Sequence, residues 1–212
     1  MPADRPAPPL SIQLETTRLV LRPPHPTDVP AVRHLLRRNA EHLRPWSPVP
    51  RAGEDPSSLT EISKGILQQR REWSKGEAFV FFIVARSDPS GGVPSGAWIG
   101  GEDGALLGRI ALRGVMRGAF LSAHLGYWVD GGQQSKGVAT EAVRKAVSFA
   151  FDTLGLHRVE AAVMPKNAAS LRVLAKLGFR KEGESPRYLQ IAGRWEDHHL
   201  FALTEEEWPA AV

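Results

Sequence analysis

Residues 134–139 read Gln-Ser-Lys-Gly-Val-Ala and stand between a short apolar stretch and a longer run of apolar residues at helical spacing. The stretch before them, Leu125–Val129, predicts a buried strand. The run after them covers residues 138–154 and is followed by Gly155, a pattern typical of a helix with a glycine at its C-terminal end. The loop is therefore expected to join a strand to a helix N-terminus, where free backbone N–H groups and the helix dipole favour a phosphate group.

This loop lacks the two best-known phosphate-binding patterns. It has neither Gly-x-x-x-x-Gly-Lys-Ser/Thr nor Gly-x-Gly-x-x-Gly, and its own pattern is Gln134-x-x-Gly137-x-Ala139. Gly137 would let the backbone approach a pyrophosphate, and the small Ala139 would leave the next turn clear. An ordinary strand-to-helix connection explains six residues equally well, so the interpretation depends on the sequence that follows.

The following residues repeat the alternation of strand and helix. Residues 157–163 predict a second strand, ended by Met164-Pro165. Asn167 is a suitable N-cap for a helix over residues 168–177, and Gly178-Phe179 then ends that helix and begins another strand. The order is strand, glycine loop, helix, strand, Asn-x-x-Ser helix and Gly-Phe.

This order resembles the GNAT acetyltransferase superfamily, in which Gln/Arg-x-x-Gly-x-Gly/Ala holds the pyrophosphate of acetyl-CoA. The flanking segments resemble the RimJ/RimL branch, which acetylates the N-terminal α-amino groups of ribosomal proteins and also contains enzymes for small amines. Those segments are Leu125–Trp128, Ala139–Ala142, Leu156–Glu160, Pro165–Ser170, Gly178–Gly183, Tyr188-Leu189, Gly193–Trp195 and Asp197-His198. A weaker resemblance reaches back to Arg18, leaving out the N-terminal tail and an insertion near residues 86–103.

The resemblance implies an α/β fold with a GNAT-like mixed, mostly antiparallel sheet, flanked by about four helices. It also implies acetyl-CoA as co-substrate, with strands 125–129 and 157–163 splayed so that the pantetheine arm lies between them. The residues expected to bind acetyl-CoA are Tyr127, Trp128, Val129, Gln134, Lys136, Gly137, Val138, Ala139, Thr140, Asn167 and Ser170.

Three residues are catalytic candidates, namely Asn167, Ser170 and His124. In the RimJ/RimL pattern the matching Asn bonds the pantetheine, and the matching Ser is placed to protonate the departing thiolate. Helix capping alone would also explain Asn167. Ser170 lies inside the predicted helix, where serine is mildly unfavourable, and this favours a functional role.

The general base is the least defined part of the predicted site. Many GNAT enzymes carry a glutamate near the position of His124 that takes the proton of the amine, and histidine can do so near neutral pH. A hydrogen-bonded strand histidine is the structural alternative. Some RimL relatives have a glutamate where this chain has Leu189. His198 and His199 are neighbours on a predicted strand and would face opposite sides, so we expect no metal site.

The amino-acid composition excludes several kinds of mechanism and binding partner. There is no cysteine, which excludes an acyl-cysteine intermediate, so acetyl transfer would be direct. Lys and Arg exceed Asp and Glu by 27 to 23 without a basic block, so no direct nucleic-acid binding is expected. The longest apolar run, Ala78–Ala85, is too short to span a bilayer. We expect a cytoplasmic protein without a membrane contact, either a monomer or a homodimer.

Residues 1–11 are Pro-rich and predicted to be disordered, followed by one acetyltransferase domain over residues 12–212. Residues 41–50 contain several prolines and are expected to lack regular structure, and residues 87–96 predict a flexible loop. The other predicted strands cover residues 18–22, 78–84, 105–112, 120–129, 179–182, 188–191 and 199–203. One further helix is predicted to start at residues 26–28 and another to span residues 58–73.

The acceptor is expected to be an amine, with Trp46 and Tyr188 near its cleft. An α-amino group with a pKa of about 7.7–8.0 loses its proton more readily at neutral pH than a lysine with a pKa of about 10.4. A chain without an obvious strong base therefore suits the N-terminal α-amino group of a (ribosomal) protein. Two alternatives remain open: a small-molecule N-acetyltransferase for an antibiotic, polyamine or amino acid, and a non-catalytic acyl-CoA-binding protein.

Overall fold

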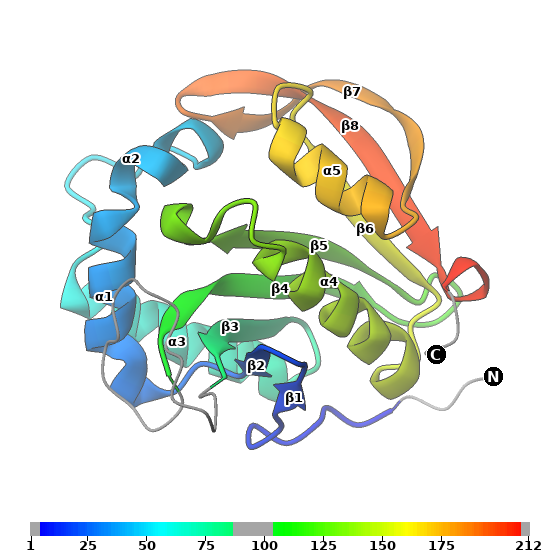
Figure 1. Cartoon of the computed structure of the whole chain (residues 1–212), viewed down its shortest axis with the longest axis horizontal. Coiled ribbons are helices and arrows are strands. Elements are labelled where there is room, and N and C mark those ends of the chain that lie inside the picture. Colours follow the sequence, from blue (N-terminus) through cyan, green and yellow to red (C-terminus); the bar gives the residue numbers. More distant parts are fainter. Residues whose placement is uncertain (1–4, 87–103, 209–212) are drawn as a thin grey trace.

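The computed structural model describes residues 5–86 and 104–208, which form one eight-stranded sheet with helices on both faces (Figure 1). The strand order is β1-β2-β3-β4-β5-β6-β8-β7. The strands are β1 (Leu14–Glu15), β2 (Leu19–Arg22), β3 (Phe79–Ala85), β4 (Leu106–Met116), β5 (Ser122–Val129), β6 (Arg158–Val163), β7 (Arg180–Ile191) and β8 (Arg194–Thr204). The α-helices in this part of the chain are α1 (Val29–Arg38), α2 (Ala40–Leu43), α3 (Leu59–Ser74), α4 (Val138–Ser148) and α5 (Ala168–Lys176).

The sheet parts between β5 and β6, the one parallel pair in an otherwise antiparallel order. Their pairing covers Ser122–His124 on β5 and Arg158–Glu160 on β6, and it ends at the pair His124 and Glu160. Beyond this pair the rest of β5 stays bonded to β4, and the rest of β6 stays bonded to β8. The predicted splayed, mixed and mostly antiparallel sheet is confirmed.

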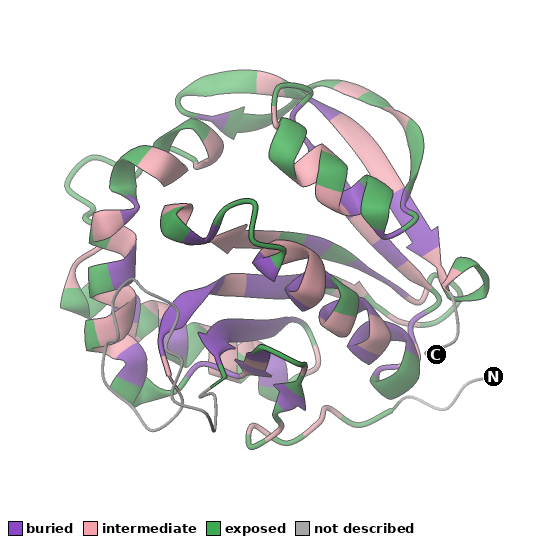
Figure 2. Cartoon of the chain, in the orientation of Figure 1, coloured by how far each residue is buried: buried purple, intermediate pink, exposed green. Residues whose placement is uncertain are grey.

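The core lies on both sides of β3, which is buried over its whole length (Figure 2). On one face Trp73 meets Phe79 and Phe81 edge-on with ring centroids 4.9 Å apart, and Phe149 closes the group. Such aromatic pairs add about 0.5–1.5 kcal/mol each beyond their buried area. Helix α4 covers this face, and α1 and α3 cover the other through Leu35, Ile62 and Ile66 among others.

Two helices position the site, and both begin where the sequence predicts. Gly137 has φ +81° and is the N-cap of α4, and Gly155, at φ +63°, follows a π-helical turn over Phe149–Thr153. Glycine adopts this left-handed backbone without the steric cost that a Cβ brings. Helix α5 is capped by Asn167, whose side-chain oxygen accepts from the N–H of Ser170.

The structure corrects several predicted elements. Helix α2 and a 3-10 helix over Arg44–Trp46 run into residues 41–50, which were expected to be irregular. Pro45 falls in the first turn of that 3-10 helix, where a missing N–H costs nothing. Helix α2 brings the α-helices to five instead of about four among the described residues. The predicted strands 179–182 and 188–191 are one strand, β7, with a register shift between Ser185 and Leu189. An edge strand tolerates the proline in that shifted stretch.

Residues 5–11, expected to belong to a disordered tail, lie against the domain. Ala7 and Leu10 pack on the main core. The buried indole of Trp73 donates from Nε1 to the Pro8 carbonyl at 2.7 Å, because a buried indole N–H needs an acceptor. The predicted loop at 87–96 lies outside the described residues. Over the part that is described, no helix has the length and apolar content to cross a membrane.

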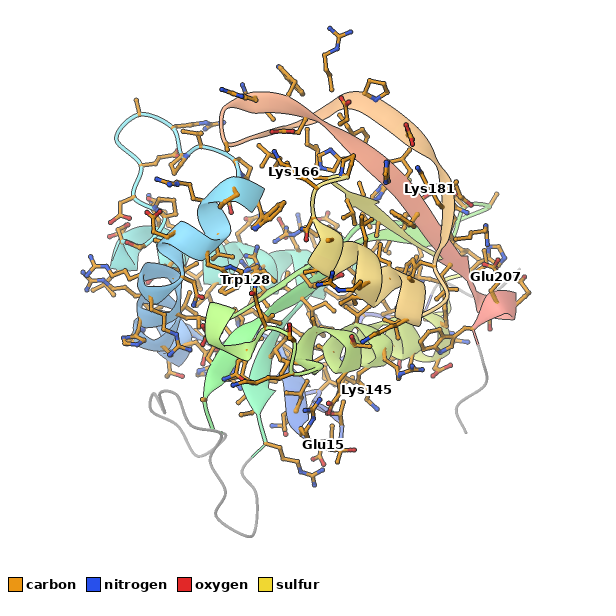
Figure 3. All side chains as sticks on the ribbon, turned by 45° about the horizontal axis from the view of Figure 1, so that its top comes forward. Glu15, Trp128, Lys145, Lys166, Lys181 and Glu207 are labelled. Atoms are coloured by element: carbon orange, nitrogen blue, oxygen red, sulfur yellow. The ribbon has the colours of Figure 1, made fainter. Side chains whose placement is uncertain are left out.

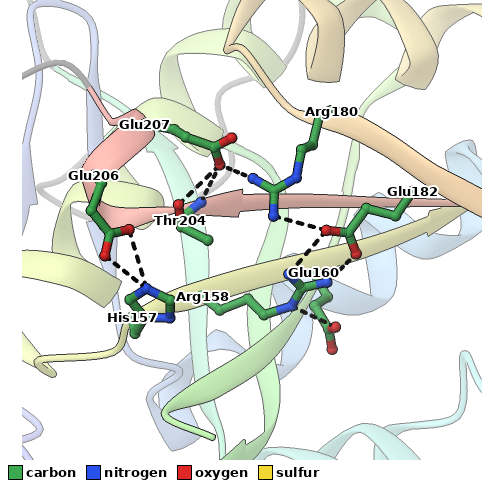
Figure 4. A network of polar contacts seen from close by, with 8 residues as sticks. All are labelled: His157, Arg158, Glu160, Arg180, Glu182, Thr204, Glu206 and Glu207. Carbon is green, nitrogen blue, oxygen red and sulfur yellow. Dashed lines mark hydrogen bonds and ion pairs between the residues drawn. The ribbon is translucent and has the colours of Figure 1, made fainter.

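A network of charged residues joins the start of β6, the start of β7 and the end of β8 (Figure 4). Arg158 donates to Glu160 at 2.8 Å and to Glu182, and Arg180 donates to Glu182 at 2.8 Å and to Glu207. The hydrogen bond from Arg158 holds the pKa of Glu182 below its ordinary value. These contacts connect β6 to the β7–β8 hairpin, which lies on the opposite side of β6 from β5.

Candidate active site

A cavity of about 460 Å³ lies between the parted strand β5, the N-terminus of α4, the helix α5 and the α2 region. It is lined by His42, Leu43, Trp46, Tyr127, Trp128, Val129, Gln133, Gln134, Ser135, Gly137, Val138, Ala139, Thr140, Asn167, Ala169, Ser170, Arg172, Val173 and Lys176. Figure 3 shows Trp128 between the α1–α2 segment and α5. Most of the residues predicted to bind the co-substrate are therefore brought together.

The loop before α4 is strained in a way that only certain residues tolerate. Ser135 has φ +60° and Gly137 φ +81°. A Cβ at Gly137 would also lie 3.2 Å from the Arg18 Nη2 atom, so a larger residue would be crowded as well as strained. With Gly137 as N-cap, the first N–H groups of α4 lack intrahelical acceptors, and residues 137–140 line the cavity. This is the geometry of an anion site.

Arg18 braces this loop from the β2 side. Its Nη1 donates to the Lys136 carbonyl at 2.9 Å, and its Nε donates to Glu141 at 2.8 Å. The Thr16 hydroxyl donates to the same carboxylate at 2.6 Å. Burial alone would raise the pKa of Glu141, but the hydrogen bonds from Thr16 and Arg18 outweigh it and lower that pKa below 4.5.

The other side of the loop is held by the end of α1. Arg38 forms a partly buried ion pair with Asp130, directly after β5. The Asn39 side chain accepts from the Gly131 N–H at 2.8 Å and donates to the Leu35 carbonyl at 2.9 Å. The Gln134 amide nitrogen lies 3.3 Å from the Nε2 atom of His42. The loop is thus fixed to α1 and α2 as well as to β2.

Two hydroxyl groups meet in the wall of the cavity. The Tyr127 and Ser170 oxygens are 2.9 Å apart, bridging β5 and α5 across the parting. Burial raises the pKa of Tyr127 to about 12, although the hydrogen bond with Ser170 lowers it, so the phenol is protonated at neutral pH. Asn167 uses its oxygen as the cap, which leaves its amide N–H₂ group available in the lining.

His124 stands at the parting of the sheet but outside the cavity lining. Its side chain is 50% exposed, and its Nδ1 lies 3.6 Å from a carboxylate oxygen of Glu160, its partner across the parallel pair. Side chains alternate between faces along β5, so His124 and Trp128 share one face while Tyr127 is on the other. His124 therefore faces the side of the sheet opposite the Tyr127–Ser170 pair.

Two other predicted residues also lie outside the lining. Lys136 contributes its carbonyl to Arg18. Tyr188 lies on β7 with its ring 5.5 Å from that of His198. Sequence reasoning missed the braces Arg18–Glu141, Arg38–Asp130 and Asn39–Gly131, because each joins residues about a hundred positions apart and no local pattern marks them.

Known proteins resemble the chain over most of its length. The family profile described as an acetyltransferase (GNAT) domain matches residues 18–180. The chain is 34% identical over 190 residues to the "Probable N-acetyltransferase YjcK" of Bacillus subtilis (strain 168), covering 90% of this chain and 96% of the relative. It is 32% identical over 197 residues to the ribosomal protein uS5-alanine N-acetyltransferase of Escherichia coli (strain K12), covering 93% of each.

A solved structure gives the same picture of the fold. Mycobacterium smegmatis RimJ in complex with CoA-disulfide matches with a TM-score of 0.79 at 33% identity, covering 91% of this chain and 85% of that chain. The fold expected from the sequence is thereby confirmed. Among the residues that the structure describes, no group of three or more His, Cys, Asp or Glu side chains could hold a metal ion.

Proposed function

Since the chain belongs to the GNAT family of acetyltransferases, it is an acetyl-CoA-dependent N-acetyltransferase, and we propose that its acceptor is the N-terminal α-amino group of a protein. A ribosomal protein is the acceptor that the relatives favour. The Escherichia coli relative is named for alanine of ribosomal protein uS5, and it matches 93% of this chain. The observation that carries the proposal is the cavity at the parted strands, which joins an anion-binding helix start to a hydroxyl pair.

The residues around the cavity fit acetyl-CoA. Gly137 leaves space where a Cβ would be crowded, and the first turn of α4 offers N–H groups to the pyrophosphate. The unpaired edges of β5 and β6 beyond His124 suit an extended amide-containing arm, which would bond them as a strand does. The free amide of Asn167 is placed to bond the same arm. Lys176 and Arg172 in the lining add positive charge near α4.

In the proposed reaction the neutral amine attacks the thioester carbonyl, the carbon–sulfur bond breaks, and the departing thiolate takes a proton. Ser170, which lines the cavity, supplies this proton and regains one from solvent before the next turnover. Tyr127 holds the Ser170 hydroxyl at 2.9 Å and keeps its own proton at neutral pH. General-acid catalysis of this kind contributes about 10²–10⁴-fold to a rate.

His124 takes the proton of the amine from the other face of the sheet. It stands at the parting, half exposed, with its Nδ1 atom 3.6 Å from a carboxylate oxygen of Glu160. A proton removed there leaves to solvent without crossing the cavity. The acceptor would enter between this face and the α1–α2 segment, where Trp46 and Trp128 line the opening.

The test follows thiol release from acetyl-CoA with four classes of acceptor. These are peptides with free N-termini, the same peptides blocked at the N-terminus but containing lysine, polyamines, and free amino acids. We expect rapid turnover with the free peptides and little with the blocked ones, because deprotonating lysine at neutral pH costs about 3 kcal/mol more than deprotonating an α-amine. Rapid turnover of a small amine, with no peptide acetylated, would overturn the proposed acceptor. CoA binding without turnover of any acceptor would indicate a non-catalytic acyl-CoA-binding protein.

A further inference from the structure

Arg109 lies on the face of the sheet that the proposed acceptor approaches. The β4–β5 register pairs Arg109 with Trp128, Ala111 with Gly126, and Arg113 with His124. Paired residues share a face, as do residues two apart on one strand, so all six belong to one face. The residues between them, Ile110 and Leu112, belong to the core that α4 covers on the opposite face.

The guanidinium of Arg109 has no partner within residues 5–86 and 104–208. Neither a hydrogen bond nor an ion pair joins its side chain to any of these residues. Two carboxylates that contact this face through other residues are paired with other arginines: Glu72 of α3 with Arg113 at 3.5 Å, and Glu160 of β6 with Arg158 at 2.8 Å. Burial, together with the charge of Arg113, lowers the pKa of Arg109 to about 10, so it remains a cation at neutral pH.

The same face of the sheet is open at the position diagonal to Arg109. Gly126, diagonal to Arg109 on the same face, is exposed, and a Cβ built there would meet no atom within 4 Å. Trp128, directly opposite Arg109, lines the cavity. The cation therefore lies one strand away from the parting where the amine is acetylated. A shielded charge without a protein partner is costly, and sites that keep one commonly bind an ion of opposite charge.

We propose that Arg109 recognises a carboxylate that the acceptor carries close to its amine. This deepens the proposed function and rests on it. Arginine binds a carboxylate through two parallel N–H···O bonds, which fixes the orientation of the group as well as its charge. The carboxylate has two possible sources, an acidic side chain among the first residues of a polypeptide or the α-carboxylate of a free amino acid.

The experiment compares Arg109→Met with wild type on matched acceptors. Two peptides differ only by Glu or Gln at the second position, and a free amino acid is compared with its amide. Wild type should acetylate the Glu peptide with the higher kcat/KM. Arg109→Met should lower kcat/KM for the Glu peptide by about ten- to a hundredfold, which is the contribution expected of a hydrogen bond between charged groups. It should leave kcat/KM for the Gln peptide within about threefold of the wild-type value. The amino-acid pair identifies the source: a matching loss there assigns the α-carboxylate.

Arg113→Met is the matched control, because Arg113 is on the same strand and face but is exposed and paired with Glu72. It should change none of the peptide ratios. Acetyl-CoA KM and the melting temperature should stay unchanged in Arg109→Met. An equal loss on the Glu and Gln peptides, or no loss on either peptide or on the free amino acid, would overturn the inference while leaving the proposed function intact. A wild-type protein that acetylates neither peptides nor amino acids would overturn both.

Discussion

At the scale of single residues, the Ser170–Tyr127 contact is where the proposed proton transfer to the departing thiolate takes place. Ser170→Ala should lower kcat by about ten- to a thousandfold and leave the acetyl-CoA KM within about twofold, because the hydroxyl acts on the departing thiolate. Thiol release at saturating acetyl-CoA measures this. Tyr127→Phe is the companion variant, and it should lower kcat less, since it removes only the partner at 2.9 Å. A rise in KM at unchanged kcat in Ser170→Ala would make the serine a binding residue.

A substitution at Gly137 tests whether the loop binds the phosphate groups of CoA. A valine at this position would have to adopt a left-handed backbone, which costs an L-residue about 1–2 kcal/mol. Its Cβ would also lie 3.2 Å from the Arg18 Nη2 atom, so the arginine side chain would have to move. Gly137→Val should weaken CoA binding by at least about tenfold in calorimetry. Gly132→Ala is the control in the same loop, because a Cβ there meets Asp130 only at 3.9 Å. Equal CoA affinity in the two variants would contradict the assignment.

The sequence predicted the residues whose roles are local. Asn167 as a cap and the start of a helix directly after Gly137 follow from neighbouring residues, and both are confirmed. Glu160 beside His124 and Tyr127 against Ser170 were not predicted, because each contact depends on which strands become neighbours. The catalytic roles of Ser170 and His124 remain predictions.

At the scale of elements, the Arg18–Glu141 brace couples β2 to the start of α4. Glu141 has a lowered pKa in the folded protein, so its ionised form stabilises the fold above its unfolded pKa near 4.5. This contribution is lost as the pH falls through the still lower folded value. Glu141→Gln should therefore be destabilised at pH 7, and its deficit should shrink progressively below about pH 4.5.

Urea unfolding of both proteins between pH 3 and pH 7 measures this difference. The acetyl-CoA KM of Glu141→Gln at pH 7 should also rise severalfold, because Arg18 loses the carboxylate that orients it toward the Lys136 carbonyl. Lys64→Met is a suitable control, since it removes an exposed ion pair with Glu61 away from the loop. A stability deficit that stays constant with pH would show that the ionised carboxylate is not what matters.

Element boundaries were predictable where the apolar pattern is long and uniform. The strand β3 and the helices α3 and α4 lie where expected. The helix α2 and the continuous edge strand β7 are not predictable from the sequence, because proline ordinarily interrupts a helix or a strand and only the fold shows where it does not. Pro45 is in the first turn of a 3-10 helix, and the proline of β7 lies on an edge strand, so neither interrupts the fold.

At the scale of the whole molecule, the parting of β5 and β6 divides the site into two sides. The α4 and α5 side carries the loop, Asn167 and the hydroxyl pair, and the opposite face carries His124, Trp128 and Arg109. The proposed co-substrate and acceptor would approach from these two sides and meet at the parting. The amine of the acceptor would therefore have to reach the thioester from the α1–α2 side.

The most direct measurement is the position of the acetyl group on a peptide that has both a free α-amine and an internal lysine. After incubation with acetyl-CoA and the protein, tandem mass spectrometry locates the added acetyl group. We predict that it lies on the N-terminal nitrogen and that the lysine stays unmodified. Acetyl groups on the lysine alone, or an unmodified peptide beside rapid acetylation of a free small amine, would contradict the account.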